Sequence, residues 1–258
     1  MTDVPAGGRY LIYLLAVGPR YRRMAAMAVR SIRTIGLWSH DIVLLSDTDE
    51  PLPGLDNVRS IDMLSAAKAR YPWMTHAASQ LHHLKSELAY HIDLTQYDYV
   101  LYLDCDVLVN SDRLVDLVTG LERECAIVVQ QDICDVSSGF PFAGGRVLDR
   151  EERRRWGAFA INSGIVGLPI NTMGRRLLRD WRQLNVDLRF SLSDQGNLIS
   201  LLLRQYYGQW GYVLDATMGR KLERYPQTFV HFTGKRYALY EAYYAQVLGL
   251  PLPAEALP

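Results

Sequence analysis

Residues 99–110 read Tyr-Val-Leu-Tyr-Leu-Asp-Cys-Asp-Val-Leu-Val-Asn. The first five form an apolar and aromatic run that is typical of a strand buried on both faces of a parallel sheet. Asp104 and Asp106 follow where this strand is expected to end, and residues two apart in extended chain point to the same side. Two converging carboxylates repel each other unless a cation lies between them, and a hard divalent ion such as Mg²⁺ or Mn²⁺ prefers oxygen ligands. The alternative is a polar strand exit with two solvated aspartates.

Strand-like and helix-like patterns alternate on the N-terminal side of this stretch. Strands are expected at residues 10–17, 41–45 and 58–61, and helices at residues 21–35 and 79–92. Such alternation predicts parallel βαβ units, and ligands of open α/β sheets bind outside the carboxyl ends of the strands. The predicted fold class is therefore α/β, with a Rossmann-like, mostly parallel central sheet flanked by helices.

The C-terminal side is less regular but contains the same kinds of segment. Helices are expected at residues 114–121, 172–184 and 195–206, and strands at residues 126–131, 158–168 and 229–232. The aromatic-rich segment that begins at residue 237 reads as a helix with few basic residues, so we expect it either to pack on the domain or to contact another copy of the chain. No repeat or linker interrupts the sequence, which favours a single domain.

Composition excludes several classes of protein. Of the 258 residues, 49% are hydrophobic and 22% are charged, which is enough to build a sizeable core. The formal net charge is zero, and this argues against nucleic acid as the main partner. No segment approaches the 18 apolar residues of a membrane span, and no secretory signal is evident. The three cysteines fit neither a disulfide framework nor a zinc spacing, so a reducing cytoplasm is the expected location.

Four features lie far apart in the sequence and follow one another in a defined order. They are Tyr21, the Asp104-Cys105-Asp106 motif, Asn162-Ser163-Gly164 followed by Asp194-Gln195, and His231-Phe232-Thr233-Gly234-Lys235. This set resembles glycosyltransferase family 8, which includes glycogenin and bacterial lipopolysaccharide galactosyl- and glucosyltransferases. The resemblance covers about residues 10–235. It implies a GT-A fold over residues 1–258, with a nucleotide-binding half at about 8–110, an acceptor-side half at about 111–236 and a C-terminal helix at 237–258.

The same resemblance implies a reaction and its cofactor. A hexose or related sugar would pass from a UDP-sugar to a hydroxyl acceptor, with Mn²⁺ (or Mg²⁺) and with retention of anomeric configuration. Asp104 would contact the metal and the ribose, Asp106 would ligate the metal, and His231 would complete the set of protein ligands. From the residues alone, His231 would instead be a structural core histidine, because its neighbours are apolar.

Further positions are matched to the donor by the resemblance. Tyr21 would stack on uracil beside Val17, although a helix-start tyrosine is the alternative. Lys85 would lie close to the donor, with a solvated surface lysine as the alternative. Asn162, Ser163 and Gly164 would lie near the donor sugar.

The expected catalytic group consists of Asp194, Gln195 and Lys235. Asp194 would bind the sugar, or else cap the following helix, and Gln195 would lie near the anomeric carbon. Gly234 would let the backbone approach the phosphates, and Lys235 would neutralise the leaving diphosphate. The chain departs from the family here, because Arg236 follows directly and Pro-Trp is absent, so the phosphate contact falls to Lys235, Arg236 or both.

Two other functions remain open from the sequence. An Asp-x-Asp at a strand end also suits a nucleotidyltransferase that acts on a sugar phosphate, although the loop after the first strand holds only one glycine, Gly18. A non-catalytic nucleotide-sugar-binding protein is the third candidate, and the altered lysine segment favours it. The products separate the three candidates: UDP with transferred sugar, pyrophosphate, or none.

Overall fold

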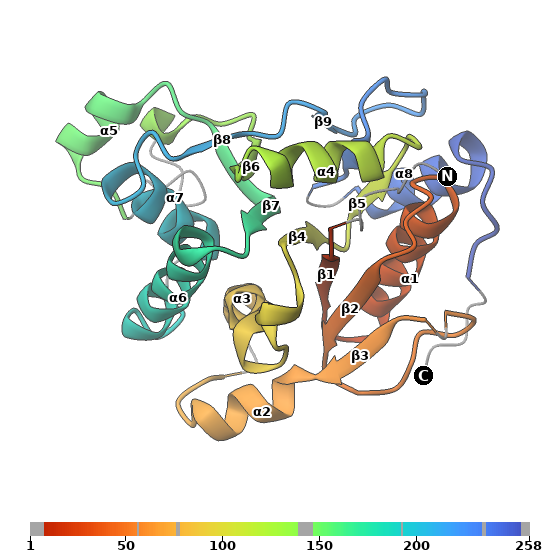
Figure 1. Cartoon of the computed structure of the whole chain (residues 1–258), viewed down its shortest axis with the longest axis horizontal. Helices are drawn as coiled ribbons and strands as arrows, with labels where there is room; N and C mark the ends of the chain where they lie inside the picture. The colour runs from red at the N-terminus through yellow and green to blue at the C-terminus, as the bar shows by residue number, and fades with distance from the viewer. Residues whose placement is uncertain are drawn as a thin grey trace, which may run out of the picture.

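A computed structural model describes residues 8–55, 57–75, 78–138, 147–191, 193–233 and 236–253 of the chain. Its centre is a seven-stranded sheet with the order β3-β2-β1-β4-β7-β6-β8 (Figure 1). The strands are β1 (Tyr10–Ala16), β2 (Asp41–Ser46), β3 (Arg59–Asp62), β4 (Tyr99–Asp104), β6 (Ile127–Gln131), β7 (Ile161–Pro169) and β8 (Trp210–Tyr212). Only β7 runs antiparallel to its two neighbours, β4 and β6, so the predicted mostly parallel α/β sheet is confirmed.

The central strands are buried on both faces, as their continuous apolar runs predict. In β1, Leu11 and Tyr13 pack into one hydrophobic core, whereas Ile12 and Leu14 pack into the core on the opposite face. Helix α1 (Pro19–Thr34), α4 (Leu114–Arg123) and α8 (Tyr237–Ala242) contribute to the core that contains Ile12. The other core receives side chains from α2 (Met63–Arg70), α5 (Arg150–Trp156), α6 (Thr172–Asp187) and α7 (Asp194–Arg204). Helices therefore cover both faces of the sheet, with α1 and α8 on one side and α6 and α7 on the other (Figure 1).

A second, three-stranded sheet brings the end of the chain back to the acidic motif. It consists of β5 (Val107–Val109), β10 (Phe229–His231) and β9 (Ala216–Met218), in that order. Strand β5 starts directly after Asp106, and its antiparallel pairing with β10 sets His231 opposite Val107. The Phe232 N–H donates to the Asp106 carbonyl oxygen at 2.9 Å. This pairing carries His231 to the Asp-x-Asp motif across 125 positions of sequence.

Several local predictions differ from the structure. Residues 79–92 were expected to form one helix, but a single α-turn, α3 (Ala78–Leu81), leads into a long 3₁₀ segment, η1 (His82–Tyr90). The C-terminal helix was expected over residues 237–258, but α8 continues as a π-helical turn, η5 (Tyr243–Val247), and residues 248–253 are not helical. The short 3₁₀ turns η2 (Leu94–Gln96) and η3 (Val136–Ser138) complete the described elements.

Within the described residues, none of the helices combines the length and the apolar character needed to cross a lipid bilayer.

Candidate metal and nucleotide-sugar site

A cavity of about 520 Å³ opens at the carboxyl ends of β1 and β4, where the α/β fold predicts a ligand site. A smaller cavity of about 100 Å³ adjoins it, and the two share Tyr21, His82, Asp104 and Asp106 as lining residues. The residues lining the larger cavity are Arg20, Tyr21, Met24, His82, Lys85, Asp104, Asp106, Asp132, Ile133, Cys134, Asn162, Ser163, Ser193, Asp194, Gln195, His231 and Thr233. Fourteen of these 17 residues carry a polar or charged group in the side chain, which suits a polar ligand.

The structure brings together Asp104, Asp106 and His231, the three predicted metal ligands. One possible ligand atom from each lies within 4.8 Å of the others. His231 Nε2 is 3.0 Å from Asp106 Oδ1 and 3.9 Å from Asp104 Oδ2. Burial opposes protonation of His231, but the charges of Asp106 and Asp104 outweigh it and raise the pKa of the imidazole above its ordinary value. Two carboxylates and an imidazole are a donor set that fits Mn²⁺ or Mg²⁺, so these residues are suited to the implied metal.

Cys105 separates the two aspartates and takes no part in this group. Its side chain is buried in the core on the α1 side of the sheet, as predicted from the alternation of an extended chain. Burial raises the pKa of its thiol well above the ordinary value, so the cysteine is a neutral core residue.

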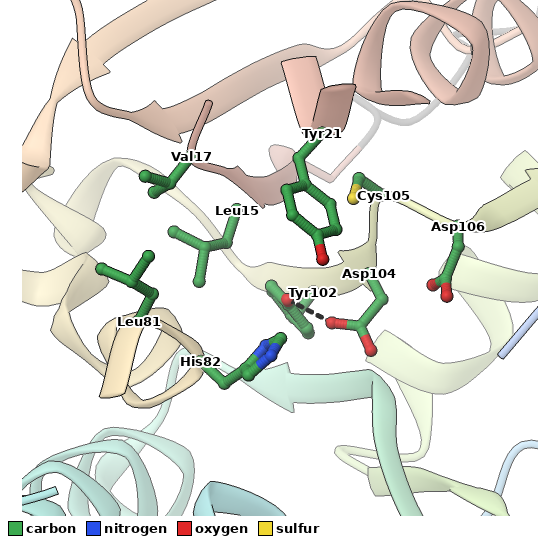
Figure 2. A pocket seen from close by; sticks show the side chains of 9 residues that line it. All are labelled: Leu15, Val17, Tyr21, Leu81, His82, Tyr102, Asp104, Cys105 and Asp106. Atoms are coloured by element: carbon green, nitrogen blue, oxygen red, sulfur yellow. Dashed lines mark hydrogen bonds between the residues drawn. The ribbon is translucent and has the colours of Figure 1, made fainter. Parts of the chain in front are cut away.

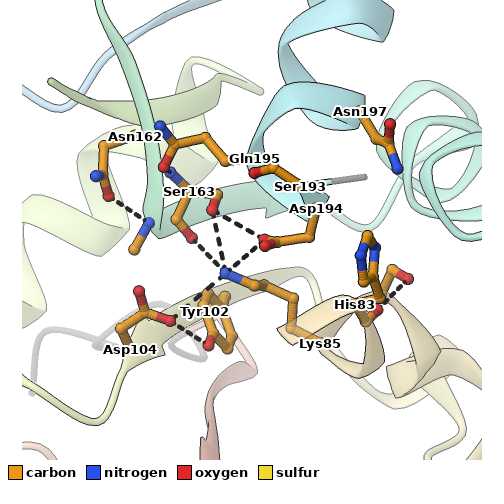
Figure 3. Close-up of polar contacts among 12 residues, drawn as sticks. His83, Lys85, Tyr102, Asp104, Asn162, Ser163, Ser193, Asp194, Gln195 and Asn197 are labelled. Atoms are coloured by element: carbon orange, nitrogen blue, oxygen red, sulfur yellow. Dashed lines mark hydrogen bonds and ion pairs between the residues drawn. The ribbon is translucent and has the colours of Figure 1, made fainter. Parts of the chain in front are cut away.

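Lys85 forms the centre of a second polar group beside the metal ligands (Figure 3). Its ammonium lies 2.8 Å from Asp194 Oδ2 and 3.5 Å from Asp104 Oδ1, and it donates to Ser163 Oγ at 3.1 Å. Burial opposes the charge of Lys85, but Asp104 and Asp194 outweigh it, and the pKa of Lys85 is raised. Since only 2% of its side chain is exposed, the alternative of a solvated surface lysine is wrong.

Asp194 belongs to the polar group around Lys85 and is not the N-cap of a helix. The cap of α7 is Ser193, whose side chain accepts the Gly196 N–H. Although burial raises the pKa of Asp194, the charge of Lys85 outweighs it and lowers the pKa overall. Asp194 is therefore an ionised carboxylate that already has a cation and, at 3.0 Å, the Ser163 hydroxyl as partners.

Gln195 is held at the cavity wall by the segment that follows β6. Its amide nitrogen donates to Asp132 Oδ2 at 3.0 Å, and its amide oxygen accepts the Ser163 N–H at 3.2 Å. The Asn162 amide also donates to Asp132, at 3.5 Å, and the Asn162 oxygen accepts the Gly164 N–H at 2.7 Å. Asn162, Ser163, Asp194 and Gln195 thus lie together, as the resemblance implies.

The smaller cavity, called the slot below, lies between Tyr21 of α1 and His82 of η1 (Figure 2). Tyr21 projects into it from the first turn of α1, with 44% of the residue exposed. Val17 and Leu15 form part of the apolar wall, and His82 faces Tyr21 from the other side. The Tyr102 hydroxyl donates to Asp104 at the base of the slot. Val17 and Tyr21 therefore line the same cavity, and their contact with a base stays a prediction.

Two arginines near the C-terminal helix differ in their relation to the cavity. Arg20 lines the larger cavity, and its guanidinium lies 4.6 Å from the ring centre of Tyr237. Arg236 is the N-cap residue that precedes α8, and its buried Nη1 has no hydrogen-bond partner among the residues that the structure describes. Gly234 and Lys235 lie outside those residues, so their predicted contacts with the diphosphate remain predictions.

Sequence reasoning missed several lining residues, among them Asp132, His82 and Arg20. Asp132 carried a usable signal, because it directly follows a strand in the same way that Asp104 ends β4. The other two gave none, since their side chains reach the cavity only through the geometry of η1 and α1.

The fold is the GT-A fold of glycosyltransferases. Among similar solved structures are the galactosyltransferase LgtC in complex with donor and acceptor sugar analogues (TM-score 0.58, 17% identity, 87% of each chain covered) and an active-site mutant of LgtC (TM-score 0.59, 16% identity, 87% of each chain). A third is the bifunctional glycosyltransferase WbbM in its apo form, with TM-score 0.61 and 13% identity. That match covers 95% of this chain and 51% of WbbM. No protein-family model and no curated protein matches the sequence.

Proposed function

We propose that this chain is a metal-dependent glycosyltransferase that moves a hexose or related sugar from a UDP-sugar to a hydroxyl acceptor, with retention of configuration. The observation that carries the proposal is the convergence of Asp104, Asp106 and His231 within 4.8 Å at one end of a cavity of about 520 Å³. The GT-A fold and the position outside the carboxyl ends of β1 and β4 support it.

Each group of residues has a part in this proposal. Asp104, Asp106 and His231 would hold Mn²⁺ or Mg²⁺, and such a cation supplies charge that stabilises the departing diphosphate. Tyr21 stacks on the base in the slot beside Val17. Arg236, together with Gly234 and Lys235, would bind the diphosphate. The three free cysteines support a reducing compartment such as the cytoplasm.

The sugar would lie against Asn162, Ser163 and Gln195, with Asp194 oriented by Lys85. Two carboxylates, Asp194 and Asp132, lie next to these residues. Their contacts favour a same-face route, in which the leaving phosphate takes the proton of the acceptor hydroxyl. Asp194 is bound to Lys85 and Ser163, and Asp132 accepts hydrogen bonds from Gln195 and Asn162. A carboxylate with such partners is a poor nucleophile, because attack would require these contacts to break.

The test is release of UDP from a panel of UDP-sugars by the purified chain with Mn²⁺. We expect release to stop in excess EDTA, and Asp106→Asn to lower it by at least ~100-fold. Asp112→Asn, which removes an exposed carboxylate six residues further on, is the matched control and should behave as the unmodified chain.

Three results contradict the proposal. They are full activity of Asp106→Asn in EDTA, formation of pyrophosphate from a nucleoside triphosphate and a sugar phosphate, and binding of nucleotide sugars without any product. NMR of the transferred sugar then tests retention, since an inverted anomer contradicts the same-face route.

A further inference from the structure

We propose that Gln130 and Gly164 are positioning residues that fix the imidazole of His231 with Nε2 directed at Asp104 and Asp106. Gln130 does so by a hydrogen bond and Gly164 by leaving room for the ring. The inference rests on the proposed function, because it concerns the metal group of that site.

The first observation is a buried hydrogen bond behind the imidazole. Gln130 Oε1 lies 2.7 Å from His231 Nδ1, and the two residues are only 1% and 2% exposed. On the other side of the same amide, the nitrogen of Gln130 lies 3.7 Å from Met218 Sδ. A thioether sulfur accepts but never donates, so this environment favours the orientation with the amide oxygen toward the ring.

This orientation decides which ring nitrogen carries the proton. An amide oxygen only accepts, so Nδ1 must be protonated, and in the neutral ring the lone pair then belongs to Nε2. Nε2 is the atom 3.0 Å from Asp106 Oδ1, on the side of the carboxylates. Gln130 therefore selects the tautomer in which Nε2 can ligate a metal.

The second observation is the absence of space beside the ring. A Cβ on Gly164 would lie 2.3 Å from His231 Cε1 and 2.8 Å from Nδ1. Distances this short do not occur between real atoms, so any side chain at 164 would displace the imidazole. The glycine of Asn162-Ser163-Gly164 is thus needed to leave room for the imidazole of His231, whether or not it also contacts a sugar.

The path of the chain explains how Gln130 reaches the ring. The pairing of β6 with β7 shifts register between Val129 and Gln130, which places Gln130 opposite Asn162. Such an irregularity re-aims side chains next to functional sites. Gln130 and Gly164 therefore approach His231 from two neighbouring strands of the main sheet, whereas His231 itself belongs to the small sheet.

The experiment measures Mn²⁺ binding directly, by the loss of the EPR signal of free Mn²⁺ on titration with protein, with and without UDP. We expect Gln130→Leu to weaken Mn²⁺ binding by ~10–100-fold, the usual effect of losing the partner of a metal-ligating histidine. Gln130→Glu keeps an acceptor at the same length and should stay within about threefold of the unmodified chain. Gln131→Leu, an exposed glutamine on the same strand, is the control.

A merely structural role of Gln130 predicts a different pattern. It would lower the thermal unfolding midpoint of both Gln130→Leu and Gln130→Glu in EDTA and leave Mn²⁺ affinity unchanged. Should Gln130→Leu fail to fold, Gln130→Met replaces it with the same expectation. Gly164→Ala offers an independent route and should also weaken Mn²⁺ binding at least ~10-fold.

The experiment distinguishes failure of the positioning role from failure of the proposed metal site. If the unmodified chain binds Mn²⁺ in an Asp106-dependent way and Gln130→Leu binds it equally well, the positioning role is wrong and the proposed function stands. If the unmodified chain does not bind Mn²⁺, or Asp106→Ala binds it as well, the proposed metal site itself is wrong.

Discussion

The buried ammonium of Lys85 gives the sharpest test of the polar group beside the metal ligands. Lys85→Met keeps the length of the side chain and removes its charge. Asp194 then stays buried, 8% exposed, with the Ser163 hydroxyl as its remaining close donor from this group. Breaking a buried ion pair from one side costs ~3–5 kcal/mol. Asp104 also loses the charge of Lys85, but its side chain is 28% exposed, so water can replace part of that interaction. We therefore expect the free energy of unfolding at pH 7 to fall by ~3–4 kcal/mol.

A second variant separates the loss of the pair from the loss of packing. Lys85→Met combined with Asp194→Asn removes both charges and keeps an acceptor for the Ser163 hydroxyl. Replacing both members of a buried pair is often nearly neutral, so the double variant should recover at least ~2 kcal/mol of the loss. Asp194→Asn alone should also be destabilised, because it leaves the ammonium of Lys85 short of a counter-charge.

The loss should also depend on pH, in a direction that the structure fixes. In the unmodified chain the pKa of Asp194 is lowered, so the stability from its ionised form is present above the unfolded value of about 3.9 and is lost as the pH falls through the folded value. In Lys85→Met, the charge of Lys85 no longer opposes the effect of burial, so we expect the pKa of Asp194 to rise. That variant is then most stable relative to the unfolded chain at low pH and loses stability as the pH rises through the raised pKa.

The difference between the two proteins should therefore shrink on acidification from pH 7 to pH 4.5. Urea unfolding followed by tryptophan fluorescence, in EDTA at both pH values, measures it. A loss below ~1 kcal/mol at pH 7, or a loss that grows as the pH falls, would refute the ion-pair account.

The remaining predictions concern the slot and the start of α6. Tyr21→Ala should weaken UDP binding by ~5–150-fold in calorimetry, because base stacking contributes ~1–3 kcal/mol, and should leave stability within ~0.5 kcal/mol; unchanged affinity would contradict stacking. Asn171 caps α6 by accepting two backbone N–H groups, so Asn171→Ala should lower the free energy of unfolding by ~1 kcal/mol in urea titration. Gly174→Ala would place Cβ 2.0 Å from the Pro169 carbonyl oxygen and should lower the free energy of unfolding by ~1–3 kcal/mol. Gly120→Ala, in a helix with open space around it, should raise the free energy of unfolding by ~0.5–1 kcal/mol. Equal effects of the two substitutions would contradict the close contact at Gly174.

The core of the fold could be predicted because burial on two faces leaves a direct trace in the sequence. Strands β1 and β4 are buried on both sides, so they read as unbroken apolar runs that end at a glycine or an aspartate. Helix α1 shows one apolar stripe, which its packing on the sheet explains. These segments carry their pattern locally, and no distant partner is needed to recognise them.

The small sheet left only a partial trace, because a strand was expected at residues 229–232 but not at its other two strands, β5 and β9. Strands β5, β9 and β10 have three residues each, too few for a periodic pattern, and they exist because they pair with each other across long stretches of chain. The position of His231 depends on that pairing. Its place next to Asp106 was therefore available from the family resemblance but not from the residues.

The 3₁₀ segment η1 explains why Lys85 was the hardest residue to place. An α-helix rotates 100° per residue, so His82 and Lys85 would be offset by about 60° around it. A 3₁₀ helix has three residues per turn, and residues three apart are eclipsed. His82 and Lys85 line the same cavity, while Leu84 and Leu88 pack into the core. A lysine on an α-helical pattern would be assigned to solvent, because the pattern contains no sign of the two carboxylates that meet it. The acidic groups that make the burial of Lys85 favourable come from β4 and α7, so the local geometry and the charge become interpretable only together.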